Sequence, residues 1–132
     1  CGWFDQGGGD LYSIHNYRYA LKIKPQKDRV VALTEYGGYA FPVKEHLWSR
    51  KEFGYKFFSS KEEVTAAYEK LWERDIFPNV EKGLSATIYT QTTDIEEEIN
   101  GLMTYDRKVD KLRVDTLRKL SQRLMEIYLA CF

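Results

Sequence analysis

Cysteine is scarce in this sequence. The chain has only two, Cys1 and Cys131, and they stand at opposite ends. They do not form the closely spaced pairs from which zinc sites are built, and two residues make no disulfide framework. The spacing argues against a disulfide-rich scaffold and predicts no metal site. It leaves the cellular compartment open, with a lean toward the reducing cytoplasm.

Long apolar runs and an excess of charge are also lacking. No stretch approaches the roughly 20 apolar residues that span a bilayer. The chain carries 20 Lys and Arg residues and 20 Asp and Glu residues, so its formal net charge is zero. Nucleic-acid-binding domains usually carry a basic patch or stripe. We therefore expect neither a membrane nor a nucleic acid as a partner.

The length bounds the domain organisation. The chain has 132 residues, of which 43% are hydrophobic. That suffices for one globular core but is about half of the ~250 residues of a complete (β/α)₈ barrel. The chain starts at Cys1, not Met, and a glycine cluster follows at residues 7–9. We read this start as a cut within a longer polypeptide, so residues 1–132 are expected to form one domain or a piece of one.

Short β-forming runs predict three strands, at residues 11–17, 30–36 and 84–90. The second run is continuously apolar, which is typical of a strand buried on both faces of a parallel sheet. A strand-helix alternation of this kind favours α/β architecture. The expected order is β, β, α, β, α.

Two apolar stripes at helical spacing predict the helices. The first begins after Ser59 or Ser60, with Glu62 or Glu63 completing a capping box, and Pro78 and Gly83 mark its end. The second covers residues 114–131. Between the second strand and the first helix, residues 39–58 form a long aromatic loop, and long ordered loops are usually functional.

Glu35 is the leading candidate for chemistry. It follows the apolar run 30–34 and precedes paired glycines, at the strand end where barrel enzymes place catalytic groups. Alternatively, Glu35 pairs with a cation at a strand end. Tyr17 and His15 likewise allow a plain packing role as well as a functional one.

Four segments together resemble glycoside hydrolase family 2, the group of β-galactosidases, β-glucuronidases and β-mannosidases. Residues 34–38 (TEYGG) are similar to the family's seventh-strand nucleophile segment, and residues 13–17 (SIHNY) are similar to the end of the preceding strand. Residues 83–94 resemble the eighth strand. Residues 100–108 resemble the segment that leads into the last barrel helix.

The resemblance implies that the chain is the C-terminal portion, about strands 6–8 with their helices, of a TIM (β/α)₈ barrel. Its parent would hydrolyse β-O-glycosidic bonds with retention, without metal or cofactor. Glu35 would be the nucleophile and Tyr17 its hydrogen-bond partner. The implied substrate-binding residues are His15, Asn16, Tyr89, Gln91 and Trp48.

Part of the implied machinery is missing from these residues. In the family the acid/base follows an asparagine in an Asn-Glu pair, and neither asparagine after Tyr17 is followed by Glu. The acid/base is therefore expected in the N-terminal remainder of the enzyme, and we expect the isolated piece to be inactive. Its open strand edges favour self-association.

Two departures from the family bear on the sugar. Better-known members carry a tryptophan beneath the sugar at the eighth strand, where this chain has Tyr89 with Gln91 nearby. The Asn-x-Lys motif that binds a uronate is absent, which disfavours glucuronides.

A non-catalytic carbohydrate-binding or structural α/β module is the main alternative to a glycoside hydrolase. Another hydrolase or transferase ranks last, because no Gly-x-Ser-x-Gly or P-loop motif occurs.

Overall fold

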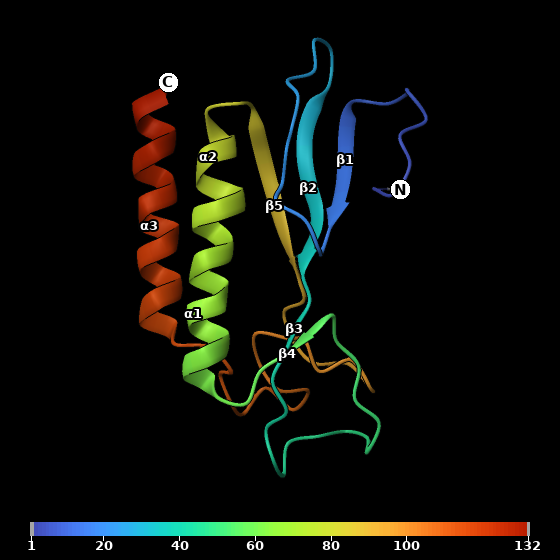
Figure 1. Ribbon diagram of the computed structural model, residues 1–132, viewed down its shortest axis with the longest axis vertical. Coiled ribbons are helices and arrows are strands. Elements are labelled where there is room, and N and C mark those ends of the chain that lie inside the picture. Colours follow the sequence, from blue (N-terminus) through green and yellow to red (C-terminus); the bar gives the residue numbers. More distant parts are fainter. Residues whose placement is uncertain (1, 132) are drawn as a thin grey trace.

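A parallel sheet of three strands forms the centre of the molecule (Figure 1). The computed structural model describes residues 2–131. The strands are β1 (Leu11–Asn16), β2 (Val30–Gly37) and β5 (Leu84–Thr90), in the order β1-β2-β5. Both pairings are parallel, so the expected strands and their α/β arrangement are confirmed. Because β2 is central, Glu35 lies between the other two strand ends.

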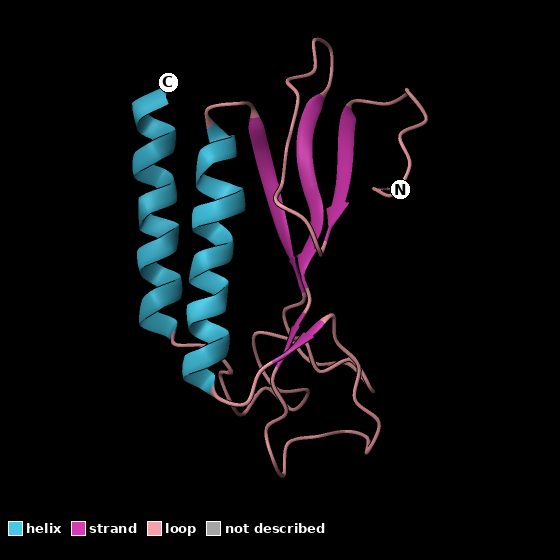
Figure 2. Ribbon diagram, viewed as in Figure 1, coloured by secondary structure: helices cyan, strands magenta, loops and turns pink. Residues whose placement is uncertain are grey.

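Helices cover one face of this sheet (Figure 2). The first helical rod consists of α1 (Lys61–Leu71), the π-helical turn η1 (Trp72–Ile76) and α2 (Phe77–Val80). The last helix, α3 (Val114–Cys131), lies beside it. The expected element order is confirmed for the long elements. Two short strands, β3 (Tyr39–Ala40) and β4 (Lys56–Phe57), were not expected from the sequence.

The capping box at the start of α1 forms as expected. The Ser60 hydroxyl accepts a hydrogen bond from the Glu63 backbone N–H at 3.1 Å. In return, the Glu63 carboxylate accepts one from the Ser59 N–H at 2.9 Å. Two N–H groups at the helix start are thereby satisfied, which fixes where the chain leaves the aromatic loop and enters the helix.

Of the two expected end markers, Gly83 follows the end of the helical rod, whereas Pro78 lies within the rod. The rod continues to Val80, and Pro78 falls in the first turn of α2. The π-helical turn η1 directly precedes it. A proline lacks the N–H that an uninterrupted helix needs, but the first turn of a new helical segment tolerates this loss. The π turn therefore lets the chain pass the proline without leaving the rod.

The core lies between the sheet and the helices. Val31 and Leu33 on β2 are 2% and 1% exposed, which confirms that this strand is buried. Tyr36 packs beside them, and Val64 and Ile76 close the layer from the helical side. Burial of such apolar side chains is the main term that stabilises a fold of this size.

The loops that follow β2 and β5 gather at the carboxyl ends of the sheet (Figure 1). A buried ion pair holds the loop that follows β5. The Lys111 ammonium donates to Asp94 Oδ1 and to the Ile99 carbonyl, both at 2.7 Å. The Gly101 N–H donates to the same Asp94 oxygen at 2.8 Å. Burial raises the pKa of Asp94 and lowers that of Lys111. The hydrogen bond between them opposes burial in both groups, because it favours their charged forms. The pair pins residues 94–111 into one arrangement.

The sheet is open along β1 and β5, so the described residues form an α/β layer and not a closed barrel.

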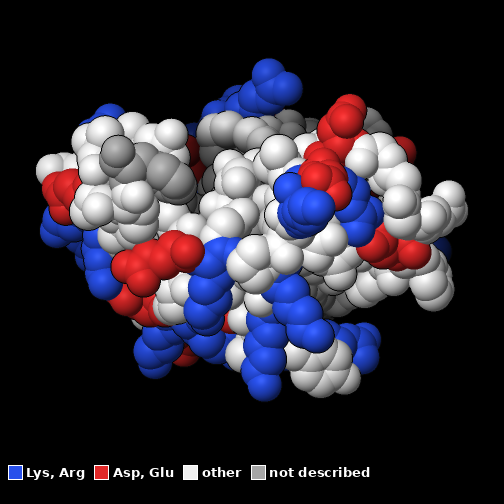
Figure 3. Space-filling model, turned by 90° about the horizontal axis from the view of Figure 1, so that it is seen from above, with Lys and Arg blue, Asp and Glu red and all other residues white. Residues whose placement is uncertain are grey.

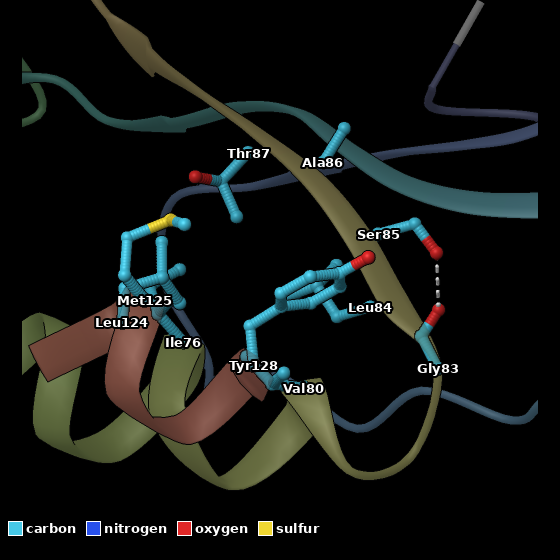
Figure 4. Close-up of a pocket in the computed structure, with 10 residues that line it drawn as sticks. All are labelled: Ile76, Val80, Gly83, Leu84, Ser85, Ala86, Thr87, Leu124, Met125 and Tyr128. Carbon is cyan, nitrogen blue, oxygen red and sulfur yellow. Dashed lines mark hydrogen bonds between the residues drawn. The ribbon is translucent and has the colours of Figure 1, made fainter. Parts of the chain in front are cut away.

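Beside β5 lies a groove of about 590 Å³ (Figure 4). Apolar side chains from β5, the helical rod and α3 line it, among them Ile76, Leu84, Leu124 and Met125. The face seen from above in Figure 3 carries both basic and acidic side chains.

Candidate active site

Three of the residues selected from the sequence meet at the carboxyl end of β2. The Tyr17 hydroxyl donates a hydrogen bond to Glu35 Oε2 at 2.9 Å. His15 Nδ1 lies 3.2 Å from the same oxygen, in the geometry of an ion-pair contact and not of an aligned hydrogen bond. The Glu35 side chain is 44% exposed. A carboxylate thus stands at the sheet edge with two polar partners on one oxygen and its surface open to solvent.

A third strand contributes to this cluster. The Thr90 hydroxyl oxygen, at the end of β5, lies 3.0 Å from the Tyr17 hydroxyl. In the sheet, Thr90 is the register partner of Gly37. Sequence reasoning did not select Thr90. The available signal was its place as the last residue of a strand parallel to the Glu35 strand, since the carboxyl ends of parallel strands meet at one edge.

Aromatic rings fix the orientation of Tyr17. Its ring stacks on that of Tyr55 with centroids 3.8 Å apart and planes at 8°. Trp3 lies near both Tyr17 and His15, with centroid distances of 6.0 and 5.3 Å. Gly38 has a φ of +61°, and a Cβ there would lie 2.5 Å from the Tyr55 ring. Glycine is therefore required for Tyr55 to reach Tyr17.

Tyr17 remains a proton donor over the physiological range. Burial raises the pKa of its phenol well above the usual value of 10.0. The Thr90 hydrogen bond lowers that pKa, whereas the hydrogen bond to Glu35 raises it. A neutral phenol next to a carboxylate stabilises the negative charge without adding a competing charge.

Two of the selected residues shape the surrounding backbone and loop. The Asn16 amide donates to the Tyr19 carbonyl at 2.7 Å and accepts from the Tyr19 N–H at 3.3 Å, so it forms the turn after β1. The Gln91 amide donates to Asn100 Oδ1 at 2.8 Å and to Glu98 Oε2 at 3.2 Å. Asn16 and Gln91 are close in sequence to residues of the Glu35 cluster, but their amides form hydrogen bonds within their own loops.

Tyr89, which the resemblance implies as a substrate-binding residue, is partly buried and packs against the core. Its ring packs edge-on against Tyr36 and Tyr68, with centroids 5.5 and 5.0 Å away. Its hydroxyl accepts a hydrogen bond from the Tyr39 N–H at 3.3 Å. Burial raises the pKa of the phenol. This position favours a packing role, and alternation along β5 explains why it faces inward while Thr90 reaches the cluster.

Trp48 stands apart from the Glu35 cluster, on the aromatic loop. It is 66% exposed, and its ring meets that of Tyr105 edge-on at 5.5 Å. A second contact joins the same two loops: His46 Nδ1 lies 2.8 Å from Asp106 Oδ2. The hydrogen bond from Thr104, together with His46, lowers the pKa of Asp106 to about 2. The contacts of Trp48 with Tyr105 and of His46 with Asp106 therefore hold the exposed Trp48 ring in place.

Within residues 2–131, no group of three or more His, Cys, Asp or Glu side chains is arranged to hold a metal ion. Over the same described range, no helix combines the length and apolar character needed to cross a membrane.

No protein-family model and no curated protein matches the chain. The assignment of a function therefore depends on the motifs in the sequence and on the geometry of the Glu35 cluster.

Proposed function

We propose that the chain supplies the nucleophile of a retaining β-glycoside hydrolase, and that Glu35 is this nucleophile. One observation carries the proposal: Glu35 Oε2 accepts a hydrogen bond from Tyr17 and contacts His15, at the carboxyl edge of a parallel sheet. A partly exposed carboxylate held in one orientation by a neutral phenol is suited to attack a carbon centre in a substrate.

The chemistry proceeds in two displacements. In the first, Glu35 forms a bond to the anomeric carbon while the bond from that carbon to the leaving oxygen breaks, and the leaving oxygen takes a proton from the acid/base carboxyl. In the second, water attacks the same carbon, gives its proton to that acid/base group and displaces Glu35 as a carboxylate. Because the polar contacts fall on Oε2, we assign the attack to Oε1.

The acid/base carboxyl belongs, in this proposal, to the N-terminal remainder of the enzyme. Retaining enzymes place their two carboxyl groups about 5 to 5.5 Å apart. The sheet of residues 2–131 is open along β1 and β5, and a TIM barrel would be completed by further strands at these edges. The substrate is a β-glycoside, and residues 1–132 alone are expected to be inactive.

The test uses the full-length polypeptide that contains this chain and a panel of aryl β-glycosides. Wild type is compared with Glu35→Gln, and with Glu96→Gln as a matched control on an exposed loop. We expect Glu35→Gln to lower kcat by roughly 10⁴-fold or more, because the nucleophile is lost, while Glu96→Gln retains wild-type rates.

A covalent trap makes the test independent of rates. A 2-deoxy-2-fluoro glycoside slows the second displacement, so the sugar ester on the nucleophile accumulates. Peptide mass spectrometry should find the added sugar on the peptide that contains Glu35. If wild type hydrolyses a glycoside but the label lies on another residue, Glu35 is not the nucleophile.

The alternative, a non-catalytic carbohydrate-binding module, is favoured by one observation, the exposed ring of Trp48. Flat aromatic faces suit the apolar faces of pyranose rings. In that case the full-length protein binds sugars but Glu35→Gln changes neither binding nor any hydrolysis. The same panel therefore separates the two functions.

A further inference from the structure

The direction of the hydrogen bonds around Tyr17 follows from counting protons. The Tyr17 hydroxyl lies 2.9 Å from Glu35 Oε2 and 3.0 Å from the Thr90 hydroxyl oxygen. A phenol has one proton to donate, and an ionised carboxylate can only accept. Tyr17 must therefore donate to Glu35. Thr90, which has a proton of its own, then donates to a lone pair of the Tyr17 oxygen.

The backbone holds Thr90 in the place this requires. The Gly38 N–H donates to the Thr90 carbonyl at 3.0 Å, and Gly37 is the register partner of Thr90 in the sheet. These contacts tie the end of β5 to Gly37, the last residue of the nucleophile strand, and to Gly38, which follows it. The stacked ring of Tyr55 holds the Tyr17 ring from the side. The ring stacking sets where the phenol oxygen lies, and Thr90 sets where its proton points.

We infer that Thr90 is a positioning residue for the proposed glycosidase reaction, acting through Tyr17 on Glu35. This inference rests on the proposed function. A hydroxyl whose lone pair is occupied by Thr90 is directed toward the carboxylate, and its donor strength increases as hydrogen bonds along a chain polarise one another. Glu35 gains negative charge when it leaves the sugar in the second displacement. The relay of hydrogen bonds from Thr90 through Tyr17 to Glu35 therefore favours that step.

The central variant is Thr90→Val in the full-length protein, because valine keeps the shape of threonine and lacks the hydroxyl. We expect kcat to fall about tenfold, the effect of one lost hydrogen bond at a reacting group. Thr90→Ser should restore most of the rate. The matched control is Thr92→Val, at an exposed threonine two residues further along, which should leave kcat unchanged.

Two readouts separate positioning from a merely structural role. With a dinitrophenyl glycoside, whose leaving group departs readily, the second displacement limits kcat. Thr90→Val should then keep its initial burst of dinitrophenol while the steady rate falls. The binding constant of an unreactive thioglycoside should stay at the wild-type value.

A double-mutant cycle with Tyr17→Phe tests the route of the effect. If Thr90 acts through Tyr17, Thr90→Val causes no further loss once the phenol hydroxyl is gone. A full additional tenfold loss in that background, or a wild-type kcat for Thr90→Val alone, would overturn the inference. Should Thr90→Val fail to fold, as judged by circular dichroism, Thr90→Ala takes its place in the same cycle.

Failure of this inference is distinct from failure of the proposed function. If Glu35→Gln abolishes turnover but Thr90→Val matches wild type, the nucleophile stands and the relay does not exist. If Glu35→Gln retains wild-type rates, the proposed function itself is wrong, and the inference falls with it.

Discussion

The register of β1 against β2 brings Tyr17 to Glu35. A β-bulge between Ile14 and His15 shifts the pairing by one residue, so that His15 and not Asn16 stands opposite Glu35. Bulges commonly redirect a side chain next to a functional site. Two residues beyond His15, the Tyr17 hydroxyl reaches the Glu35 carboxylate at 2.9 Å. The contact between the two residues thus depends on a local irregularity of the sheet.

Removal of the Tyr17 hydroxyl should slow the proposed reaction. Tyr17→Phe leaves the stacked ring and takes away a hydrogen bond to a charged group. Such bonds contribute roughly 1.5 to 3 kcal/mol, so kcat is expected to fall about 10- to 100-fold in the full-length protein. Tyr19→Phe, at a tyrosine that is 78% exposed, should be silent. Equal rates for both variants would argue against a role for Tyr17.

Trp48 should contribute to the binding of longer substrates. Trp48→Ala removes the exposed ring that Tyr105 supports. We expect KM for a β-linked disaccharide to rise about tenfold while KM for a small aryl glycoside changes little, since stacking contributes roughly 1 kcal/mol or more. Trp48→Phe keeps a flat ring and serves as the control. If KM rises equally for both substrates, Trp48 does not contact the leaving group.

The buried ion pair should be indispensable for stability. Lys111 and Asp94 have side chains that are 1% and 3% exposed, and their charged atoms are 2.7 Å apart. Lys111→Met leaves a buried carboxylate without its cation, which costs about 3 to 5 kcal/mol. Urea denaturation measures this loss. Lys108→Met, at a side chain that is 73% exposed, is the control and should change the free energy of unfolding by less than about 0.5 kcal/mol.

Asp106 should make stability depend on pH in the acidic range. Hydrogen bonds from Thr104 and His46 lower its pKa from 3.8 to about 2 in the folded state. A carboxyl group with a depressed folded-state pKa stabilises the fold above pH 3.8, and this contribution is lost as the pH falls toward 2. Asp106→Asn should therefore show a flatter stability profile in this window. An unchanged slope in urea titrations at several pH values would contradict the expectation.

The open edge beside β5 should cause the isolated chain to associate. Ile88 on β5 is 57% exposed, and Met125 in the adjoining groove is 55% exposed. Unpaired strand edges next to apolar surface favour pairing between copies. Light scattering of residues 1–132 should detect oligomers, which Ile88→Lys reduces. Phe4→Lys, at an exposed residue outside the groove, is the control. A single monomeric species for wild type would refute the prediction.

The sequence alone located most of the regular structure. The apolar run before Glu35 predicted a buried strand, and Val31 and Leu33 are indeed buried. The capping box predicted that α1 begins after Ser59 or Ser60, and its N-cap is Ser60. These features were accessible because hydrophobic periodicity and capping depend on residues that are close in the chain. The sequence also selected Glu35 and Tyr17, whose contact the structure then supplies.

The tertiary structure decided the rest. Thr90 joins Tyr17 across 73 positions of sequence, and Lys111 reaches Asp94 across 17. Tyr89, which the family resemblance implies as a substrate-binding residue, is partly buried and packs edge-on against Tyr36. Each of these outcomes depends on strand register and on which face of a strand a side chain occupies, and a shift of one residue reverses that face. Local patterns therefore determine which elements form, while the pairing of distant strands determines which side chains meet.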